Sequence, residues 1–202
     1  MKLNSNFYTR DSVTLIAREL IGKVIFTFID RNLSAGIITE TEAYAGIKDK
    51  ASHAYNNRRT ARNEVMYEEG GVAYVYLCYG IHHLFNIVTN KKSIPDAVLL
   101  RGILPINGIK VMENRSGKNL TGMDIIAGPG KTSKALGITV NHNKESLIGN
   151  LIWIEDFGYN PDRNDILTGH RIGVAYAGED AFLPYRFLLS RKAATHIKKS
   201  PA

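Results

Sequence analysis

Residues 72–89 read VAYVYLCYGIHHLFNIVT. Valine, tyrosine, phenylalanine and isoleucine favour extended backbone, so we predict strands at residues 72–78 and 84–89. The pattern breaks at Tyr79-Gly80, where the glycine favours a tight turn. These residues therefore predict a β-hairpin that protrudes from its sheet and carries a rigid tyrosine ring at its tip.

The segments on both sides of this hairpin predict a mixed fold. Residues 113–122 are rich in Asn, Arg, Ser, Gly and Lys and predict a surface loop. Strands and helices do not alternate regularly, which indicates an α+β fold with a curved, mostly antiparallel sheet and flanking helices. The further strands are expected at residues 23–29, 36–44, 97–103, 151–155 and 186–189, and the helices at residues 12–21, 108–114 and 132–136.

Length and composition limit the classes of protein that need to be considered. With 202 residues, of which 44% are hydrophobic, the chain is long enough for one sizeable core, so residues 1–202 are expected to form a single domain. The single cysteine, Cys78, excludes an intrachain disulfide and is typical of a reducing compartment. The first residues lack the apolar core of a signal peptide, and no run of about 18 apolar residues could span a bilayer. We expect a soluble cytoplasmic protein without a membrane partner.

The chain is basic, with a formal net charge of +7 and a pI near 9.4. Such a surface attracts polyanions, although many proteins with no nucleic-acid role are equally basic. Arg58, Arg59 and Arg62 are suited to phosphate contacts, and a solvated basic loop is an equally good interpretation of them. Gly130-Lys131-Thr132 resembles the end of a P-loop, but Ile125 occupies the place of the first glycine, which excludes a nucleotide triphosphatase of that type. A helix that begins there could still contact a phosphate through its backbone amides.

Two acids on one predicted strand are the first candidates for catalysis. Glu40 and Glu42 are two residues apart, so their side chains share a face and their backbone positions lie roughly 6.6 Å apart. A carboxyl pair at such a separation serves inverting sugar hydrolases, in which one acid protonates the leaving oxygen and the other activates water. An isolated pair of this kind is more often a solvated strand face, so both interpretations remain open at this point.

Aromatic side chains near these acids could form the walls of a pocket. Tyr44 shares the face of Glu42, while Tyr74 and Tyr76 share a face of the first hairpin strand. Such stripes more often pack a core than bind a flat heterocycle. Tyr79 differs from them, because an exposed ring at a hairpin tip could wedge between stacked bases.

The sequence contains no pattern of metal ligands. His82 and His83 are adjacent and therefore point to opposite faces of a strand, and neither a cysteine cluster nor a His-x-x-x-His pattern accompanies them. We predict no metal and no cofactor.

Taken together, a series of short motifs resembles the alkyladenine (3-methyladenine) DNA glycosylase family. The resemblance covers residues 12–191, and the motifs occur in the family's order and nearly with its spacing, which argues against chance. The motifs are Glu-Thr-Glu-Ala-Tyr at 40–44, Ala-Ser-His at 51–53, Arg62-Asn63 with Met66, Tyr-Val-Tyr-Leu-Cys-Tyr-Gly at 74–80, Asn86-Ile87, Val-Leu-Leu-Arg at 98–101, Gly-Pro-Gly-Lys at 128–131, Arg-Ile-Gly-Val at 171–174 and Ala-Gly-Glu at 177–179.

The resemblance implies a role for each matching residue. Glu42 would be the general base and Arg101 would help to place the attacking water, which leaves Glu40 a supporting or surface role. Tyr79 would fill the gap that a displaced base leaves in the duplex, and Asn86 would disfavour the 2-amino group of normal guanine. The base pocket would consist of Tyr44, His53, Tyr76, Asn86 and Val174, while Arg58, Arg59, Arg62 and Lys131 are expected to contact the DNA backbone.

The implied activity is that of a monofunctional DNA glycosylase. It would flip alkylated, and in some cases deaminated, purines out of duplex DNA and hydrolyse the N-glycosidic bond, leaving an abasic site for base excision repair. We expect a monomer that binds double-stranded DNA with damaged purines, in the nucleoid if the source is prokaryotic. Two rival interpretations remain: a carbohydrate hydrolase that needs both Glu40 and Glu42, and a nucleic-acid binding module that does not need Glu42.

Overall fold

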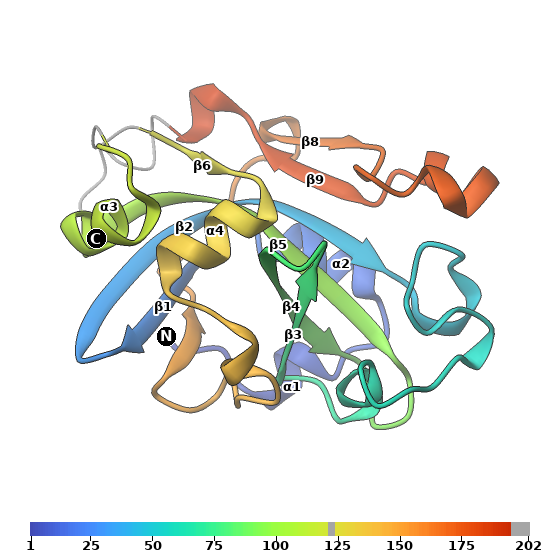
Figure 1. Ribbon diagram of the computed structural model, residues 1–202. Coiled ribbons are helices and arrows are strands. Elements are labelled where there is room, and N and C mark those ends of the chain that lie inside the picture. Colours follow the sequence, from blue (N-terminus) through green and yellow to red (C-terminus); the bar gives the residue numbers. More distant parts are fainter. Residues whose placement is uncertain (121–123, 195–202) are drawn as a thin grey trace.

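The computed structural model describes residues 1–120 and 124–194, and in this part of the chain nine strands form one curved sheet (Figure 1). The path through the sheet is β3-β4-β5-β2-β1-β7, with β6 added to β5 and the pair β8-β9 added to β2. All of these pairings are antiparallel, so the predicted α+β fold with a mostly antiparallel sheet is confirmed. The strands are β1 (Val24–Ile29), β2 (Asn32–Tyr44), β3 (Ala73–Cys78), β4 (His82–Thr89), β5 (Asp96–Asn107), β6 (Ile126–Ala127), β7 (Ile152–Glu155), β8 (Ile166–Gly169) and β9 (Arg186–Leu189).

Helices cover both faces of the sheet, with α2 behind it and α4 in front of it in Figure 1. On one face, the hydroxyl of Thr41 in β2 donates to the carbonyl of Ala17 in α2 at 2.7 Å. On the other, the hydroxyl of Thr27 in β1 donates to the carbonyl of Leu136 in α4 at 2.8 Å. The helices are α1 (Ser5–Tyr8), α2 (Val13–Glu19), α3 (Ile109–Ser116) and α4 (Pro129–Leu136), and the 3₁₀ segments are η1 (Gly46–Lys48), η2 (Tyr55–Asn57), η3 (Glu64–Tyr67), η4 (Val140–His142), η5 (Arg163–Asp165) and η6 (Ala175–Phe182).

The long strand β2 organises the sheet because both of its edges are paired. Strand β5 runs along one edge, while β1 pairs with the first part of the other edge and β9 with residues 40–42. Helices lie over both faces, so ten consecutive residues of β2 are buried and the strand does not alternate between buried and exposed positions. Any polar side chain in this stretch must therefore find its partners inside the protein.

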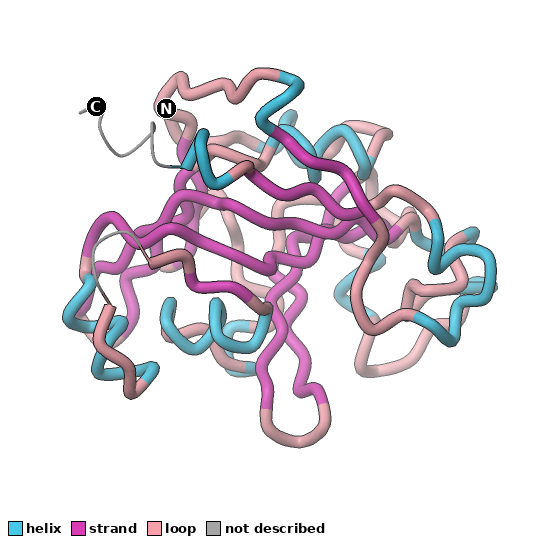
Figure 2. Tube along the Cα trace, turned by 90° about the horizontal axis from the view of Figure 1, so that it is seen from above, coloured by secondary structure: helices cyan, strands magenta, loops and turns pink. Residues whose placement is uncertain are grey.

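The predicted hairpin is present and consists of β3 and β4, which extend away from the body of the sheet (Figure 2). Tyr79 and Gly80 both have positive φ values, 51° and 73°, as a tight hairpin turn requires. The Tyr79 side chain is 92% exposed at the tip, as its position in the sequence predicts.

Several predicted boundaries are wrong at one end. Strand β2 begins at Asn32 instead of residue 36, because Asp30 and Arg31 adopt positive φ and form a two-residue turn. Helix α4 begins at Pro129 instead of residue 132, since proline is well suited to the first helical position. The predicted loop at residues 113–122 begins later, after α3 ends at Gly117 with φ 71°, and its residues 121–123 lie outside the described part of the chain.

The short elements α1, β6 and β8 are not predicted from the sequence, because each is only two to four residues long and depends on neighbours elsewhere in the chain. In the described residues, no helix combines the length and the apolar character that crossing a membrane requires.

Candidate active site

The two candidate acids lie on the face of β2 that is turned away from α2, together with an arginine that a bulge brings to them. In the pairing of β2 with β5, Glu40 lies opposite Gly102 and Thr41 opposite Leu100, so Arg101 is the extra residue of a β-bulge. A bulge re-aims a side chain, and here the Arg101 guanidinium lies against both carboxylates. Its Nε donates to Glu40 Oε1 at 2.9 Å and lies 3.3 Å from Glu42 Oε1.

The close approach of the strands at Gly102 and hydrogen bonds to the Arg101 carbonyl hold the bulge in place. A Cβ on Gly102 would lie 3.0 Å from the Cβ of Glu40 and 2.9 Å from Thr39 Oγ1, so only glycine lets the strands approach here. The Arg101 carbonyl accepts hydrogen bonds from the Gly128 amide at 2.8 Å and the Thr132 hydroxyl at 3.1 Å. The Gly-Pro-Gly-Lys motif that begins α4 therefore fixes the backbone of Arg101, which explains why a P-loop-like sequence occurs without a P-loop.

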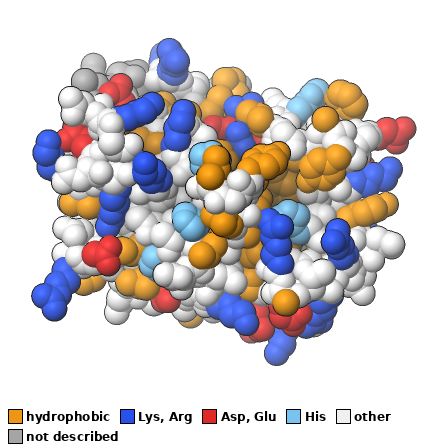
Figure 3. Space-filling model, in the orientation of Figure 1, with side chains coloured by type: hydrophobic (Ala, Val, Ile, Leu, Met, Phe, Trp, Pro, Cys, Tyr) orange, Lys and Arg blue, Asp and Glu red, His pale blue; other side chains and the backbone are white. Residues whose placement is uncertain are grey.

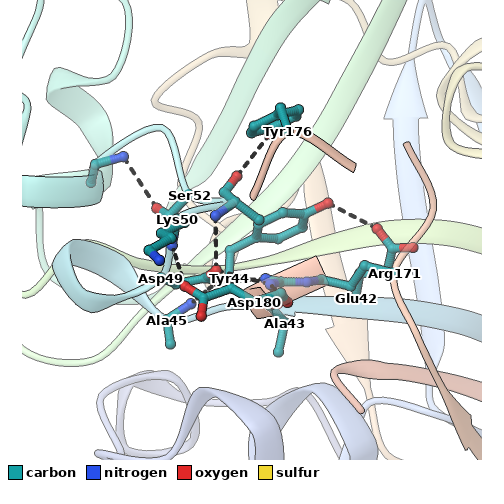
Figure 4. A network of polar contacts seen from close by, with 12 residues as sticks. Glu42, Ala43, Tyr44, Ala45, Asp49, Lys50, Ser52, Arg171, Tyr176 and Asp180 are labelled. Atoms are coloured by element: carbon teal, nitrogen blue, oxygen red, sulfur yellow. Dashed lines mark hydrogen bonds and ion pairs between the residues drawn. The ribbon is translucent and has the colours of Figure 1, made fainter. Parts of the chain in front are cut away.

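Glu42 is fully buried and hydrogen-bonded at both carboxylate oxygens. Oε1 accepts from the backbone amide of Ile172 at 2.8 Å. Oε2 accepts from the hydroxyl of Tyr44 at 2.9 Å, as Figure 4 shows. Burial raises the pKa of Glu42 above its ordinary value, while Arg101 and these two hydrogen bonds oppose the shift. A carboxylate offers about four acceptor positions, so one remains after the contacts with Ile172, Tyr44 and Arg101.

A cavity of about 460 Å³ lies in front of these groups, between the hairpin and the segment around residues 172–176. Its size is that of a pocket for a small organic ligand. Glu42 lies behind the wall of this cavity, whereas Arg101 and Ile172, both of which contact it, belong to the wall. The predicted site residues that line the cavity are Tyr44, His53, Arg62, Tyr76, Tyr79, Asn86, Arg101 and Val174.

The aromatic residues of the pocket hold one another in place. His53 Nδ1 and the Tyr74 hydroxyl share a hydrogen bond of 2.8 Å, and the His53 ring meets the Tyr76 ring edge to face with centroids 4.8 Å apart. The Arg62 guanidinium lies 4.8 Å from the centroid of the Tyr76 ring. Burial, together with the charges of Arg62 and Arg58, lowers the pKa of His53 to about 4, so its ring is neutral near pH 7.

A buried ion pair joins the pocket wall to the main sheet. Arg171, whose side chain has no exposed area, forms an ion pair with Asp49 through both terminal nitrogens, and its Nη2 donates to Asp49 Oδ1 at 2.8 Å. The same guanidinium donates to the Ala43 carbonyl at 2.9 Å and stacks 4.9 Å from the centroid of the Tyr44 ring. This contact covers one face of Tyr44 and fixes the segment that presents the Ile172 amide to Glu42 (Figure 4).

Two predicted site residues, Asn86 and Val174, contribute an amide and an aliphatic side chain to the wall of the cavity. Asn86 in β4 is buried, and its Nδ2 donates to the Tyr74 carbonyl at 3.1 Å, which fixes the orientation of the side-chain amide. Val174 is buried against Ala51 and Ala177 at the start of η6. Both positions are therefore rigid walls that can exclude a ligand by its shape.

Exposed groups surround the mouth of the cavity. Tyr79 at the hairpin tip and Tyr176 in η6 both line it although they are 92% and 70% exposed, and the Tyr176 hydroxyl donates to the Ala51 carbonyl at 3.0 Å. In Figure 3, hydrophobic side chains gather near the centre of the face that carries the hairpin, with lysine and arginine side chains around them. This face therefore combines apolar contact area with positive charge.

The remaining basic residues of the prediction lie outside the cavity. Arg59 forms an exposed ion pair with Glu64 at 2.5 Å and covers the ring of Tyr67. Arg58 and Lys131 are exposed, and the residue before Lys131, Gly130, packs against His82, which directly follows the hairpin turn. Among the described residues, no three His, Cys, Asp or Glu side chains come together in a way that could hold a metal ion.

The structure corrects the interpretation of Glu40 and adds residues that the sequence did not reveal. Glu40 is 4% exposed, so a surface role is wrong and only the supporting role agrees with the structure. Arg186 in β9 donates to Glu40 at 2.7 Å, and no local pattern predicts that contact across 146 residues. The Ile172 amide is equally invisible in a sequence, because every residue except proline has one. Asp49 pairs with Arg171 of the Arg-Ile-Gly-Val motif. In the sequence, only its position shortly after the predicted strand at residues 36–44 could have pointed to it.

Comparisons with known proteins show what this chain is similar to. The sequence profile of the methylpurine-DNA glycosylase family matches residues 6–193. A protein of Chlamydia felis is 43% identical over 196 residues, which cover 96% of this chain and 100% of that protein. A protein of Clostridium novyi is 41% identical over 205 residues, with 98% of both chains covered, and one of Desulfitobacterium hafniense is 38% identical over 204 residues, with 98% and 99% covered. All three are named as 3-methyladenine DNA glycosylases.

Proposed function

Because this chain belongs to the methylpurine-DNA glycosylase family, we propose that it turns alkylated and deaminated purines out of duplex DNA into the cavity described above and excises them there. Family membership makes it a hydrolase of N-glycosyl bonds, a DNA-3-methyladenine glycosylase of base excision repair. The observation that carries the finer proposal is the contact of Arg101 with Glu42 behind an aromatic cavity whose mouth carries the exposed ring of Tyr79.

For a cationic alkylated base, the chemistry requires little more than a positioned water and a negative charge, whereas a neutral deaminated base must also gain a proton as it leaves. An alkylated purine such as 3-methyladenine is cationic, so its bond to the sugar breaks with the electron pair moving to the base, which leaves neutral. The sugar approaches an oxocarbenium ion, whose positive charge the Glu42 carboxylate stabilises. Water then forms the new bond to the sugar carbon and gives its proton to Glu42, whose remaining acceptor position is available for it.

The walls of the cavity suit a flat, positively charged base. Tyr44 keeps one ring face free because Arg171 covers the other, and His53 is neutral near pH 7, so neither ring repels a cation. Stacking on such rings contributes about 1 to 3 kcal/mol per base, which offsets the few kcal/mol that base flipping costs. Asn86, held by the Tyr74 carbonyl, would meet the 2-amino group of a normal guanine and disfavour it.

The exposed groups around the mouth suit the DNA duplex. Tyr79 would enter the gap that the displaced base leaves, while Arg58, Arg59 and Lys131 would contact phosphates along the backbone. Arg62 would reach the phosphate beside the flipped nucleotide, since its guanidinium already lies over Tyr76 at the cavity wall. We propose that the protein acts on DNA as a monomer, within the nucleoid if the cell is prokaryotic.

The proposed function is tested by incubating the protein with duplexes that carry 3-methyladenine, 7-methylguanine, hypoxanthine or ethenoadenine. We expect free base to appear, measured before any alkaline treatment, with an intact strand that alkali then cleaves at the abasic site. An undamaged duplex of the same sequence is the control. Cleavage of sugar substrates without base release would favour a carbohydrate hydrolase, and equal affinity for intact and damaged duplexes without base release would favour a binding module.

Replacement of Tyr79 by alanine is expected to weaken binding of lesion-containing duplex. The ring is 92% exposed at the hairpin tip, so its loss removes stacking on DNA of about 1 to 3 kcal/mol, or about 5- to 150-fold in affinity. Fluorescence anisotropy with a labelled duplex measures the change. Phe28→Ala removes a ring that is 48% exposed on β1 and serves as the matched control. Equal affinity of Tyr79→Ala and the unmodified protein would exclude the wedge role.

A further inference from the structure

Glu40 lies at the centre of a group of four charged side chains, of which Glu40, Glu42 and Arg101 are buried and Arg186 is partly exposed. Its Oε1 accepts from Arg101 Nε at 2.9 Å and from Arg186 Nε at 2.7 Å, and its side chain is only 6% exposed. Arg101 also approaches Glu42 at 3.3 Å. Three strands supply the group: β2 carries both acids, and β5 and β9 carry one arginine each. With two acids and two arginines, the formal charge of the group is zero.

The arrangement makes Glu40 and Glu42 competitors for one cation. Arg101 Nε lies closer to Glu40, and among the described residues no protein group accepts a hydrogen bond from its two terminal amino groups. The side chain lines the cavity, so these amino groups are available to a ligand or a water there. If the Glu40 carboxylate were absent, Glu42 would remain as the acid that contacts Arg101, and the guanidinium would move onto the proposed base.

We propose that Glu40 is a positioning residue, which together with Arg186 holds Arg101 beside Glu42 so that the guanidinium faces the cavity and leaves the Glu42 carboxylate free to accept a proton. This inference rests on the proposed role of Glu42 as the general base. Arg186 has a defined part in it, because it balances the charge of Glu40 and so limits how strongly Glu40 attracts Arg101. Glu40 itself touches neither the substrate nor the reacting atoms.

Removing the charge of Glu40 and removing that of Arg186 should shift the pKa of Glu42 in opposite directions. Glu40→Gln deletes a neighbouring negative charge and sends Arg101 to Glu42, and both changes lower the pKa of Glu42. Arg186→Gln leaves Glu40 paired with Arg101 alone among the contacts described above, which draws Arg101 away and raises the pKa of Glu42. The other titratable or charged groups that face Glu42 are Tyr44 from its own strand and Arg171 from the segment after β8, and neither variant changes them.

The decisive measurement is the titration of Glu42 by NMR, in protein labelled with ¹³C at the glutamate side-chain carboxyl. The Glu42 signal is assigned by its loss in Glu42→Gln. We expect the pKa of Glu42 to fall in Glu40→Gln, to rise in Arg186→Gln and to stay close to that of the unmodified protein in Arg186→Lys, which keeps the charge. This readout needs no substrate, so it tests the inference even if the protein releases no base from DNA.

Kinetics provide the second readout in the same variants. In single-turnover release of 7-methylguanine, Glu40→Gln is expected to slow the chemical step by up to about 100-fold, while the Kd for the damaged duplex changes little. Glu19→Gln, which breaks a partly exposed pair with Arg10 far along the chain from the site residues, is the control and should match the unmodified protein. The inference is overturned if the pKa of Glu42 is unchanged in Glu40→Gln, or if Glu40→Gln and Arg186→Gln shift it in the same direction. Slower release accompanied only by a lower Tm would show a structural role instead and would equally overturn it.

Discussion

Replacement of Glu42 by glutamine is expected to slow the release of 7-methylguanine from duplex DNA by about 100- to 10,000-fold, the range that a general base contributes. Glutamine keeps the shape of the side chain and can accept from the Ile172 amide, but it can neither take a proton from water nor offer a negative charge to the oxocarbenium-like sugar. Binding of damaged duplex should remain, because the aromatic walls and the exposed basic residues are unchanged. Single-turnover assays with enzyme in excess separate the two quantities.

The pH dependence of the unmodified protein gives an independent check on the same residue. The base must be ionised to act, and burial raises the pKa of Glu42 above the ordinary value of 4.5. Activity should therefore be lost as the pH falls through a value above 4.5, and this acidic limb should vanish from the residual rate of Glu42→Gln. Near-full excision by Glu42→Gln, alongside an unaffected Glu19→Gln control, would rule out Glu42 as the base.

Replacement of Asp49 by asparagine is expected to cause the largest loss of stability. The Asp49 carboxylate accepts from Arg171, from the Ala45 amide at 3.0 Å and from the Ala51 amide at 2.9 Å, and its side chain is 1% exposed. Asparagine would leave the buried Arg171 without its counter-charge and place an amide donor against another donor. Breaking a buried pair in this way costs about 3 to 5 kcal/mol, and each kcal/mol lowers Tm by about 2 to 4 °C in a chain of this size.

Thermal unfolding followed by circular dichroism measures this effect. Glu64→Gln is the matched control, because it removes the acid of the exposed Arg59 pair and should leave Tm nearly unchanged. If Asp49→Asn lowers Tm no more than this control does, the buried pair does not hold the pocket wall. Where the variant remains folded, base release should also slow, since the Ile172 amide that orients Glu42 belongs to the segment that Arg171 fixes.

The hairpin shows how far local sequence can predict this protein. Extended-backbone preferences on both sides of Tyr79-Gly80 are enough to predict β3, β4 and the turn, because residues that pair across a tight turn are neighbours in the chain. The helix at residues 12–21 is predicted for the same kind of reason, because its apolar residues recur on one face. In the structure, the Ser12 hydroxyl accepts from the Leu15 amide and caps this helix. Boundaries are predicted less well, as at Pro129, where proline at the first helical position starts α4 before the predicted residue 132.

The sequence alone predicted the acid of the site, the aromatic walls and the exposed ring at the hairpin tip, because strand periodicity and motif order depend on residues close to one another in the chain. It could not decide between the roles of Glu40 and Glu42 from their spacing, since both share one face of β2. The family resemblance favours Glu42 as the base, but only the tertiary structure gives the physical difference between the two acids, by placing Arg101 on a bulge, Arg186 on a strand 146 residues from Glu40, and the Ile172 amide against Glu42. The physical reason is that charge balance and burial are set by neighbours in space, which no local pattern of residues records.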